Sequence, residues 1–559
     1  MQRLVRALSL ALPLVVLACG GAPLQPAHIA SQAVARPEAP TPTVPRSPFD
    51  IGVVSANDEV FPSGDPPAVD LASLVAARAA DGVTPPPATC AAFAARKSSG
   101  AAPKEADASL AALVLALRET DVGKRDALLV ALETAPGMPA GLVRALRGDL
   151  APVECADVVV EPLLSTKGTA IAGNVQHALV GQSLAARLAR TVTKAPSLLP
   201  PYDKARVIEY IRGPLRIWIS GQAKAIDEIS RAGSKLASYG KAIVAVEAGL
   251  ADMRFVERVR ELPLPTEFAK DEELKAAYFA SLDQVLDPRK DRGRDAALIG
   301  LREFASIGAL YDARVERARV LLGKLYAGRR IDALDALLLP PLADAKPVSQ
   351  TEQLAATLPT FYAAILLEPK VVSDEKVLRA LLDRGVPAPM RAALVDPAGL
   401  FDALPAGGRE LYARARLELG KTYWRAIDFE RAAAISVAGD AARHRSEEAT
   451  LVLAVAMALR AGPKDAVEMM HAPSPYALNI RQVEALDAIA DSPGKYAGMA
   501  AFDAALLLGT APPEGARAPY FLDVARRFHA ASARLTNATD KAQAEERAHT
   551  AEAIANATK

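Results

Sequence analysis

The sequence predicts an all-α protein of stacked helical hairpins that follows an unstructured N-terminal tether. Alanine, the strongest helix former, supplies 117 of the 559 residues, whereas Phe, Tyr and Trp supply only 13, 12 and 2. Apolar segments follow one another with short connections that contain Gly or Pro, which is typical of antiparallel helix hairpins. Prolines gather ahead of these segments, where the chain cannot bury a core.

Composition and charge exclude some classes of protein. Hydrophobic residues make up 51% and charged residues 23% of the chain, which is typical of globular proteins. The 66 Lys and Arg residues are balanced by 65 Asp and Glu residues. No excess of positive charge is left to neutralise phosphates, so a nucleic-acid partner is not expected.

The first 18 residues are predicted to be a secretion signal. Arg3 and Arg6 give a positive start, and the stretch from Ala7 to Leu17 is apolar. This run is too short to span a bilayer, which needs about 20 residues. We expect it to be removed or processed on export.

The four residues from Val16 to Cys19, VLAC, resemble the lipobox of bacterial lipoproteins. The resemblance implies that Cys19 is lipidated and becomes the membrane-anchored N-terminus, although Leu17 departs from the usual small residue. The alternative is an ordinary secreted protein whose signal ends in Cys. Gly20 stands where an aspartate often retains lipoproteins in the inner membrane, so the resemblance favours the outer membrane, facing the periplasm.

Residues 19–68 are predicted to be a tether with an irregular end. Seven prolines lie between residues 20 and 48. This part would reach about 90 Å as polyproline II and about 30 Å as a flexible coil. A short strand at Asp50 to Val54 is the one regular element considered there.

Three helical regions are expected after the tether: residues 69–160, residues 161–345 and residues 346–559. Leu215 to Ser220 is the best strand candidate and equally fits a helix begun by Pro214. The clearest predicted helices lie at Ala108–Leu117, Asp126–Ala135, Gly141–Leu150, Lys204–Ile211, within Lys224–Leu250, at Glu272–Leu286 and at Arg317–Gly328.

The first helical region contains the two remaining cysteines, Cys90 and Cys155. Export would place them in an oxidising compartment, where an even pair usually forms a disulfide. A closed loop of about 66 residues would stabilise the fold by about 4 kcal/mol. The alternative is two separate buried thiols.

The most specific fold signal is a pair of predicted helices with small and large apolar residues at matching positions: Leu419, Gly420, Tyr423, Phe429 and Ala432. Small residues allow the helices to approach closely, and the larger side chains fill the space beside them. The pattern is similar to a tetratricopeptide repeat. A second unit 34 residues later, the period of that family, places Leu453, Ala454 and Ala466 in corresponding positions. The alternative is a generic helical bundle.

Several short motifs resemble phosphate-binding or catalytic motifs but lack neighbouring residues that those motifs require. The Gly-Lys-Thr at 420–422 has Ala415 where a phosphate-binding loop needs glycine, and we interpret Lys421 as a helix-surface residue. The GQSLA sequence at 181–185 lacks the second glycine of a nucleophile elbow, so Ser183 is expected to be a buried helix serine. His177 is interpreted as a core or surface histidine.

Residues 287–295, DPRKDRGRD, space three aspartates four residues apart among cations. A calcium loop needs oxygen ligands at every second residue and few cations. We therefore interpret the stretch as a solvated loop between helices or, as the alternative, a polar partner-contact site. No catalytic, cofactor-binding or metal-binding residue is expected anywhere in the chain.

Taken together, the lipobox-like cysteine, the tether and the repeat-like helices predict a non-catalytic, lipid-anchored scaffold that binds protein partners in the bacterial cell envelope. The alternative is an envelope enzyme with a helical superstructure, such as a lytic transglycosylase-like peptidoglycan hydrolase.

Overall fold

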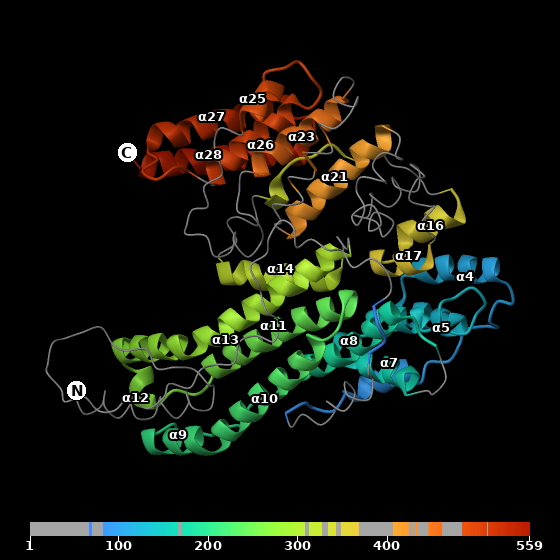
Figure 1. Ribbon diagram of the computed structural model, residues 1–559. Coiled ribbons are helices and arrows are strands. Elements are labelled where there is room, and N and C mark those ends of the chain that lie inside the picture. Colours follow the sequence, from blue (N-terminus) through green and yellow to red (C-terminus); the bar gives the residue numbers. More distant parts are fainter. Residues whose placement is uncertain are drawn as a thin grey trace. The chain divides into compact units, whose positions relative to one another are not determined.

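The computed structural model describes most of the chain after the tether (Figure 1). The described residues are 66–69, 82–165, 170–307, 312–326, 334–341, 348–367, 406–423, 429, 432, 433, 436, 445–460, 483–510 and 512–558. Every regular element among them is a helix. This confirms the all-α prediction, whereas Cys19, Ala466 and the strand considered at Asp50 to Val54 lie outside the described residues.

The chain divides into two compact units. The first comprises residues 1–52, 65–109 and 119–303, and the second comprises residues 53–64, 110–118 and 304–559. The division at residue 303 lies within residues 161–345, which are predicted to form one helical region. The predicted domain limits stay predictions. None of the helices in the described residues is long and apolar enough to cross a bilayer.

The first unit contains most of the α-helices that the alanine-rich segments predicted. Its elements are η2 (Ala88–Cys90), α3 (Ala91–Ala94), the start of α4 (Ala106–Arg118), α5 (Val122–Leu132), α6 (Leu142–Leu150), η3 (Val153–Cys155), α7 (Ala156–Leu164), α8 (Gly173–Ala189), α9 (Lys204–Tyr210), η4 (Ile211–Leu215), α10 (Arg216–Gly233), α11 (Ser238–Arg260), α12 (Thr266–Ala269) and most of α13 (Glu272–Ser306).

Helix α8 is the centre of the first unit. It packs against α6, α7, α10 and α11, and it is buried on nearly all sides, as expected for a helix without a polar face. Gly181 allows a close approach, because a Cβ atom there would lie 2.6 Å from the Cα of Gly240 in α11. The GQSLA motif therefore contains a packing glycine, and its Ser183 is a buried helix serine, as expected.

The strand alternative at Leu215 to Ser220 is wrong. Helices α9 and α10 are joined by the π-helical turn η4, which contains Pro214. A π turn accommodates proline because it relieves the clash and the missing donor that proline brings to an α-helix. The sequence run from Lys224 to Leu250 comprises two helices, since α10 ends at Gly233 and α11 begins at Ser238.

The second unit contains the remaining helices: α14 (Ala313–Tyr326), α16 (Gln350–Thr357), α17 (Thr360–Leu366), α21 (Ala406–Tyr423), α23 (Glu447–Arg460), α25 (Glu484–Ala490), α26 (Ala497–Thr510), α27 (Ala518–Arg534) and α28 (Ala538–Ala557). From α21 onward, each of these helices packs against the next one along the chain. Figure 1 shows α27 and α28, in red, side by side as a hairpin.

Candidate functional site

The two cysteines of the first unit form a disulfide, which confirms the predicted pairing. Cys90 ends η2 and Cys155 ends η3, and their Cα atoms are 5.0 Å apart. Each cysteine is only 1% exposed. The bond therefore ties the turn η2 to the start of α7 from within the core.

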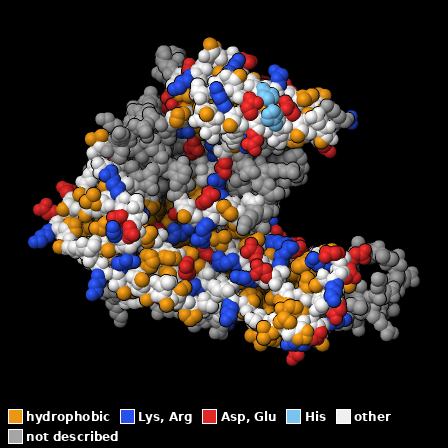
Figure 2. All heavy atoms as spheres, turned by 180° about the vertical axis from the view of Figure 1, so that it is seen from behind, with side chains coloured by type: hydrophobic (Ala, Val, Ile, Leu, Met, Phe, Trp, Pro, Cys, Tyr) orange, Lys and Arg blue, Asp and Glu red, His pale blue; other side chains and the backbone are white. Residues whose placement is uncertain are grey.

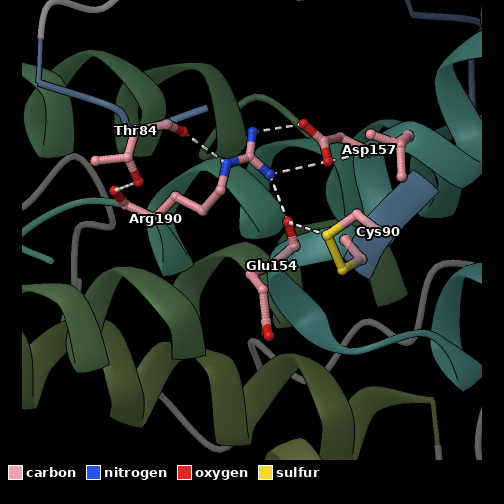
Figure 3. Close-up of a disulfide and its surroundings, with 7 residues drawn as sticks. Thr84, Cys90, Glu154, Asp157 and Arg190 are labelled. Atoms are coloured by element: carbon pink, nitrogen blue, oxygen red, sulfur yellow. Dashed lines mark hydrogen bonds and ion pairs between the residues drawn. A yellow bond between two sulfur atoms is a disulfide. The ribbon is translucent and has the colours of Figure 1, made fainter. Parts of the chain in front are cut away.

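Beside the disulfide lies a buried arginine, Arg190, which follows α8 (Figure 3). Its guanidinium donates to both carboxylate oxygens of Asp157, at 2.9 and 2.6 Å, and to the carbonyl oxygen of Glu154 at 2.5 Å. It also donates to the carbonyl oxygen of Thr84 at 2.9 Å. This bidentate, charge-assisted pair fixes the segment before Cys90 against α7 and α8.

A second buried arginine, Arg147 in α6, joins the neighbouring helices. Its Nε donates to Asp126 of α5 at 2.6 Å, and it also pairs with Glu133 and donates to the carbonyl of Phe93. Burial lowers the pKa of Arg147, but Asp126 and Glu133 outweigh that effect and leave its pKa raised. Because each charge here has a partner, removing one member of the cluster would leave a buried charge unpaired and would loosen the packing of α5 and α6.

The stretch 287–295 does not form the predicted loop. It lies inside α13 with Pro288 in the helix, and Arg289 and Arg292 are only 2% and 4% exposed. Both arginines pair with Asp252 of α11, at 2.7 and 3.0 Å, and with Asp227 of α10, at 3.2 and 2.5 Å. The solvated-loop interpretation is wrong. Carboxylates that are distant in the sequence neutralise the buried arginines, and the local spacing of residues does not reveal such partners.

His177 is a core histidine whose two ring nitrogens are both used. Its Nδ1 accepts from the backbone N–H of Ala237 at 2.8 Å, so its Nε2 carries the proton and donates to the carbonyl oxygen of Pro67 at 3.0 Å. The backbone N–H of Val69 donates to Gln176. These bonds attach the described segment 66–69 to the start of α8.

The repeat-like residues in the second unit are buried where the structure describes them. Leu419, Tyr423 and Ala432 are 0% exposed. A Cβ atom at Gly420 would lie 2.3 Å from the ring of Phe429, so glycine is needed for that contact. Leu453 and Ala454 are buried in α23. The side chains pack closely, and the assignment to the tetratricopeptide family remains a proposal.

Lys421 is not a helix-surface residue. It is 8% exposed, and its ammonium donates to the carbonyl oxygen of Leu337 at 3.3 Å. Arg414, two turns earlier on the same face of α21, is 7% exposed and donates to the carbonyl oxygen of Pro340 at 2.9 Å. Both cations also pair with Glu418, which lies between them.

Asp503 of α26 holds the same segment. It is fully buried, and one carboxylate oxygen accepts from the backbone N–H of Leu338 at 2.7 Å. Burial raises the pKa of Asp503 well above its ordinary value, although the Leu338 N–H and the charge of Lys421 act in the opposite direction. Sequence reasoning missed this residue, yet a lone carboxylate in the apolar run 497–510 is a visible signal.

An exposed cluster of histidines and carboxylates lies between α27 and α28. His529 bridges Glu545 and Glu552, at 2.9 and 3.1 Å, and His549 contacts Glu552 at 3.2 Å. Figure 2 shows histidine side chains among red carboxylates on the surface. Within the described part of the chain, no group of three or more His, Cys, Asp or Glu side chains could hold a metal ion.

Comparisons with known proteins return nothing. No protein-family model, curated protein or solved structure matches the chain.

Proposed function

We propose that the protein is a lipid-anchored scaffold of the bacterial cell envelope that binds other proteins through its helical surfaces. The observation that carries this proposal is the buried disulfide between Cys90 and Cys155. Disulfides persist mainly in oxidising compartments. The bond therefore supports export independently of the signal-like N-terminus.

The lipobox-like Cys19 and the tether are the second support. The chain between Cys19 and the first described segment contains many prolines. Pro67 and Val69 then bond to the start of α8, so the segment that follows the predicted tether joins the first unit through hydrogen bonds. Such an arrangement suits a body that stands away from a membrane while it engages partners.

The use of charged residues also supports a scaffold. The buried cations Arg147, Arg190, Arg289 and Arg292 are bonded to carboxylates of neighbouring helices. These groups fix helix packing, and paired buried charges are costly to break. A rigid array of helices presents extended surfaces to partners. The alternative function is a peptidoglycan hydrolase with a helical superstructure.

Crosslinking in intact envelopes tests the proposal. The full-length chain is expected to capture specific proteins, and the purified chain is expected to leave peptidoglycan intact. Release of soluble muropeptides by the purified chain would favour the hydrolase. A chain that fractionates with the cytoplasm would contradict the envelope location.

A further inference from the structure

Residues 334–341 of the second unit, which we call the strap, are held by distant side chains. The strap comprises one helical turn that ends at Ala336 and an irregular stretch from Leu337 to Pro341. The two prolines disfavour continuation of the helix, since a residue before proline avoids the α region. The stretch is therefore committed to a non-helical backbone whose polar groups need partners outside a helix.

Three ionisable side chains, which we call the strap site, supply those partners. Lys421 and Arg414 donate to the carbonyl oxygens of Leu337 and Pro340, and Asp503 accepts from the N–H of Leu338. All three side chains are more than 90% buried. Main-chain bonds of this kind hold a peptide largely irrespective of its side chains.

Apolar side chains add selectivity to this main-chain recognition. Leu334 and Leu337 are each 4% exposed, and Pro340 is also buried. Main-chain bonds combined with buried side chains are how proteins recognise non-helical peptides. The strap therefore shows which chemistry the site accepts, namely a leucine-rich segment that ends in proline.

The strap leaves part of the site unused. The second carboxylate oxygen of Asp503 is buried and has no hydrogen-bond partner among the described residues. An unsatisfied buried polar atom is costly, and a ligand with a complementary hydrogen-bonding group removes that cost. The site is thus better matched to a segment with one more hydrogen-bonding group than the strap offers.

We infer that the strap site binds a leucine- and proline-containing segment of a partner protein, and that residues 334–341 occupy the site as an internal competitor. A partner segment carrying a hydroxyl or amide group beside Asp503 displaces the strap. The inference deepens the proposed scaffold function and rests on it for the existence of a protein partner.

Fluorescence anisotropy with a labelled peptide, DALLLPP, tests the inference on the full-length chain in lipid nanodiscs. In the strap variant, Gly-Ser-Gly-Ser-Gly replaces residues 337–341. We expect this variant to bind the peptide at least about tenfold more tightly than the parent, because a linked competitor acts at a millimolar effective concentration. Absence of binding to a strap variant with parental helicity overturns the inference. If the strap variant does not fold, Leu337→Ala serves the same comparison.

Variants of the strap site locate the binding. In the strap variant, Asp503→Leu and Arg414→Met should each weaken peptide binding at least about tenfold, since each removes a buried hydrogen bond to the peptide backbone. Arg526→Met is the matched control, because Arg526 lies exposed on α27 and pairs only locally. Equal binding by Asp503→Leu, or an equal loss in Arg526→Met, overturns the assignment of the site.

A second peptide tests the unused carboxylate oxygen. DALTLPP places a threonine hydroxyl next to the N–H that Asp503 binds, and it should bind at least about fivefold more tightly than DALLLPP. Equal or weaker binding overturns the assignment of that oxygen to the ligand. Envelope crosslinking reports the scaffold function separately, because partners captured by other surfaces remain captured when Asp503→Leu abolishes peptide binding.

Discussion

At the scale of single residues, some glycines lie where a neighbouring group comes very close to a helix backbone. Gly420 faces the ring of Phe429, and Gly181 faces Gly240. Each position tolerates no side chain without displacement of a neighbour. A small residue in an alanine-rich helix is unremarkable by composition, so these contacts depend on the neighbouring helix rather than on local propensity.

Gly420→Leu should therefore destabilise the second unit by about 1–3 kcal/mol or more, because the new side chain overpacks against Phe429. Thermal or urea unfolding followed by circular dichroism measures the loss. Gly100→Leu is the matched control, since a Cβ atom at Gly100 meets nothing within 4 Å. Equal stability of Gly420→Leu and the parent would contradict the close contact.

At the scale of elements, the hairpin of α27 and α28 is held by a small apolar interface and by polar contacts between His529 and two glutamates of α28. Helix α28 buries only alanines, namely Ala544, Ala548, Ala551 and Ala555. Alanine buries little apolar area. The contacts of His529 with α28 therefore contribute a larger share of the packing of α28 on α27 than they would if leucines formed the interface. Glu545 also bonds Ser532 of α27.

Docking of α28 should be strongest between about pH 4.5 and 6.5. The bond to Glu552 raises the pKa of His529 above its ordinary 6.5, so the stabilisation is complete below 6.5 and is lost as pH rises through the raised value. The pKa of Glu545 is lowered from 4.5 by Ser532 first and then by His529. The pKa of Glu552 is lowered from 4.5 by His529 and His549. The stabilisation from both carboxylates is therefore present above pH 4.5 and is lost as the pH falls through these lowered values.

Hydrogen exchange of α28 amides, corrected for the intrinsic rate at each pH, measures this effect. Protection in α28 should fall as the pH rises above 6.5, and His529→Gln should remove the change. Amides of α26 are the internal reference. A parallel fall in α26, or an unchanged profile in His529→Gln, would refute the bridge.

The disulfide is also an element-scale constraint, because it joins η2 to η3 across a separation of 65 residues. Replacing both cysteines, Cys90→Ala with Cys155→Ala, should destabilise the first unit by about 4 kcal/mol, since the unfolded chain gains the entropy of an open loop. Urea unfolding without reductant checks this value. Two free thiols in the denatured parent would contradict the bond.

At the scale of the whole molecule, the predicted lipid anchor at Cys19 determines whether the protein is bound to the membrane. Cys19→Ala should release the chain into the soluble fraction or leave an uncleaved precursor, because stable membrane anchoring needs the acyl chains that Cys19 would carry. Fractionation and labelling with a palmitate analogue measure the outcome. An unlabelled parent that fractionates like Cys19→Ala would eliminate the lipoprotein proposal.

The helical class and most helix positions could be predicted from the sequence, because alanine content, apolar spacing and Gly or Pro breaks act over a few residues. The sequence also limited the disulfide to the pair Cys90 and Cys155. Tertiary structure alone decided that Arg289 and Arg292 lie inside a helix and that Lys421 is buried. Burial of a charge depends on partners such as Asp252 and Leu337, which lie tens of residues away, so no local pattern reveals it.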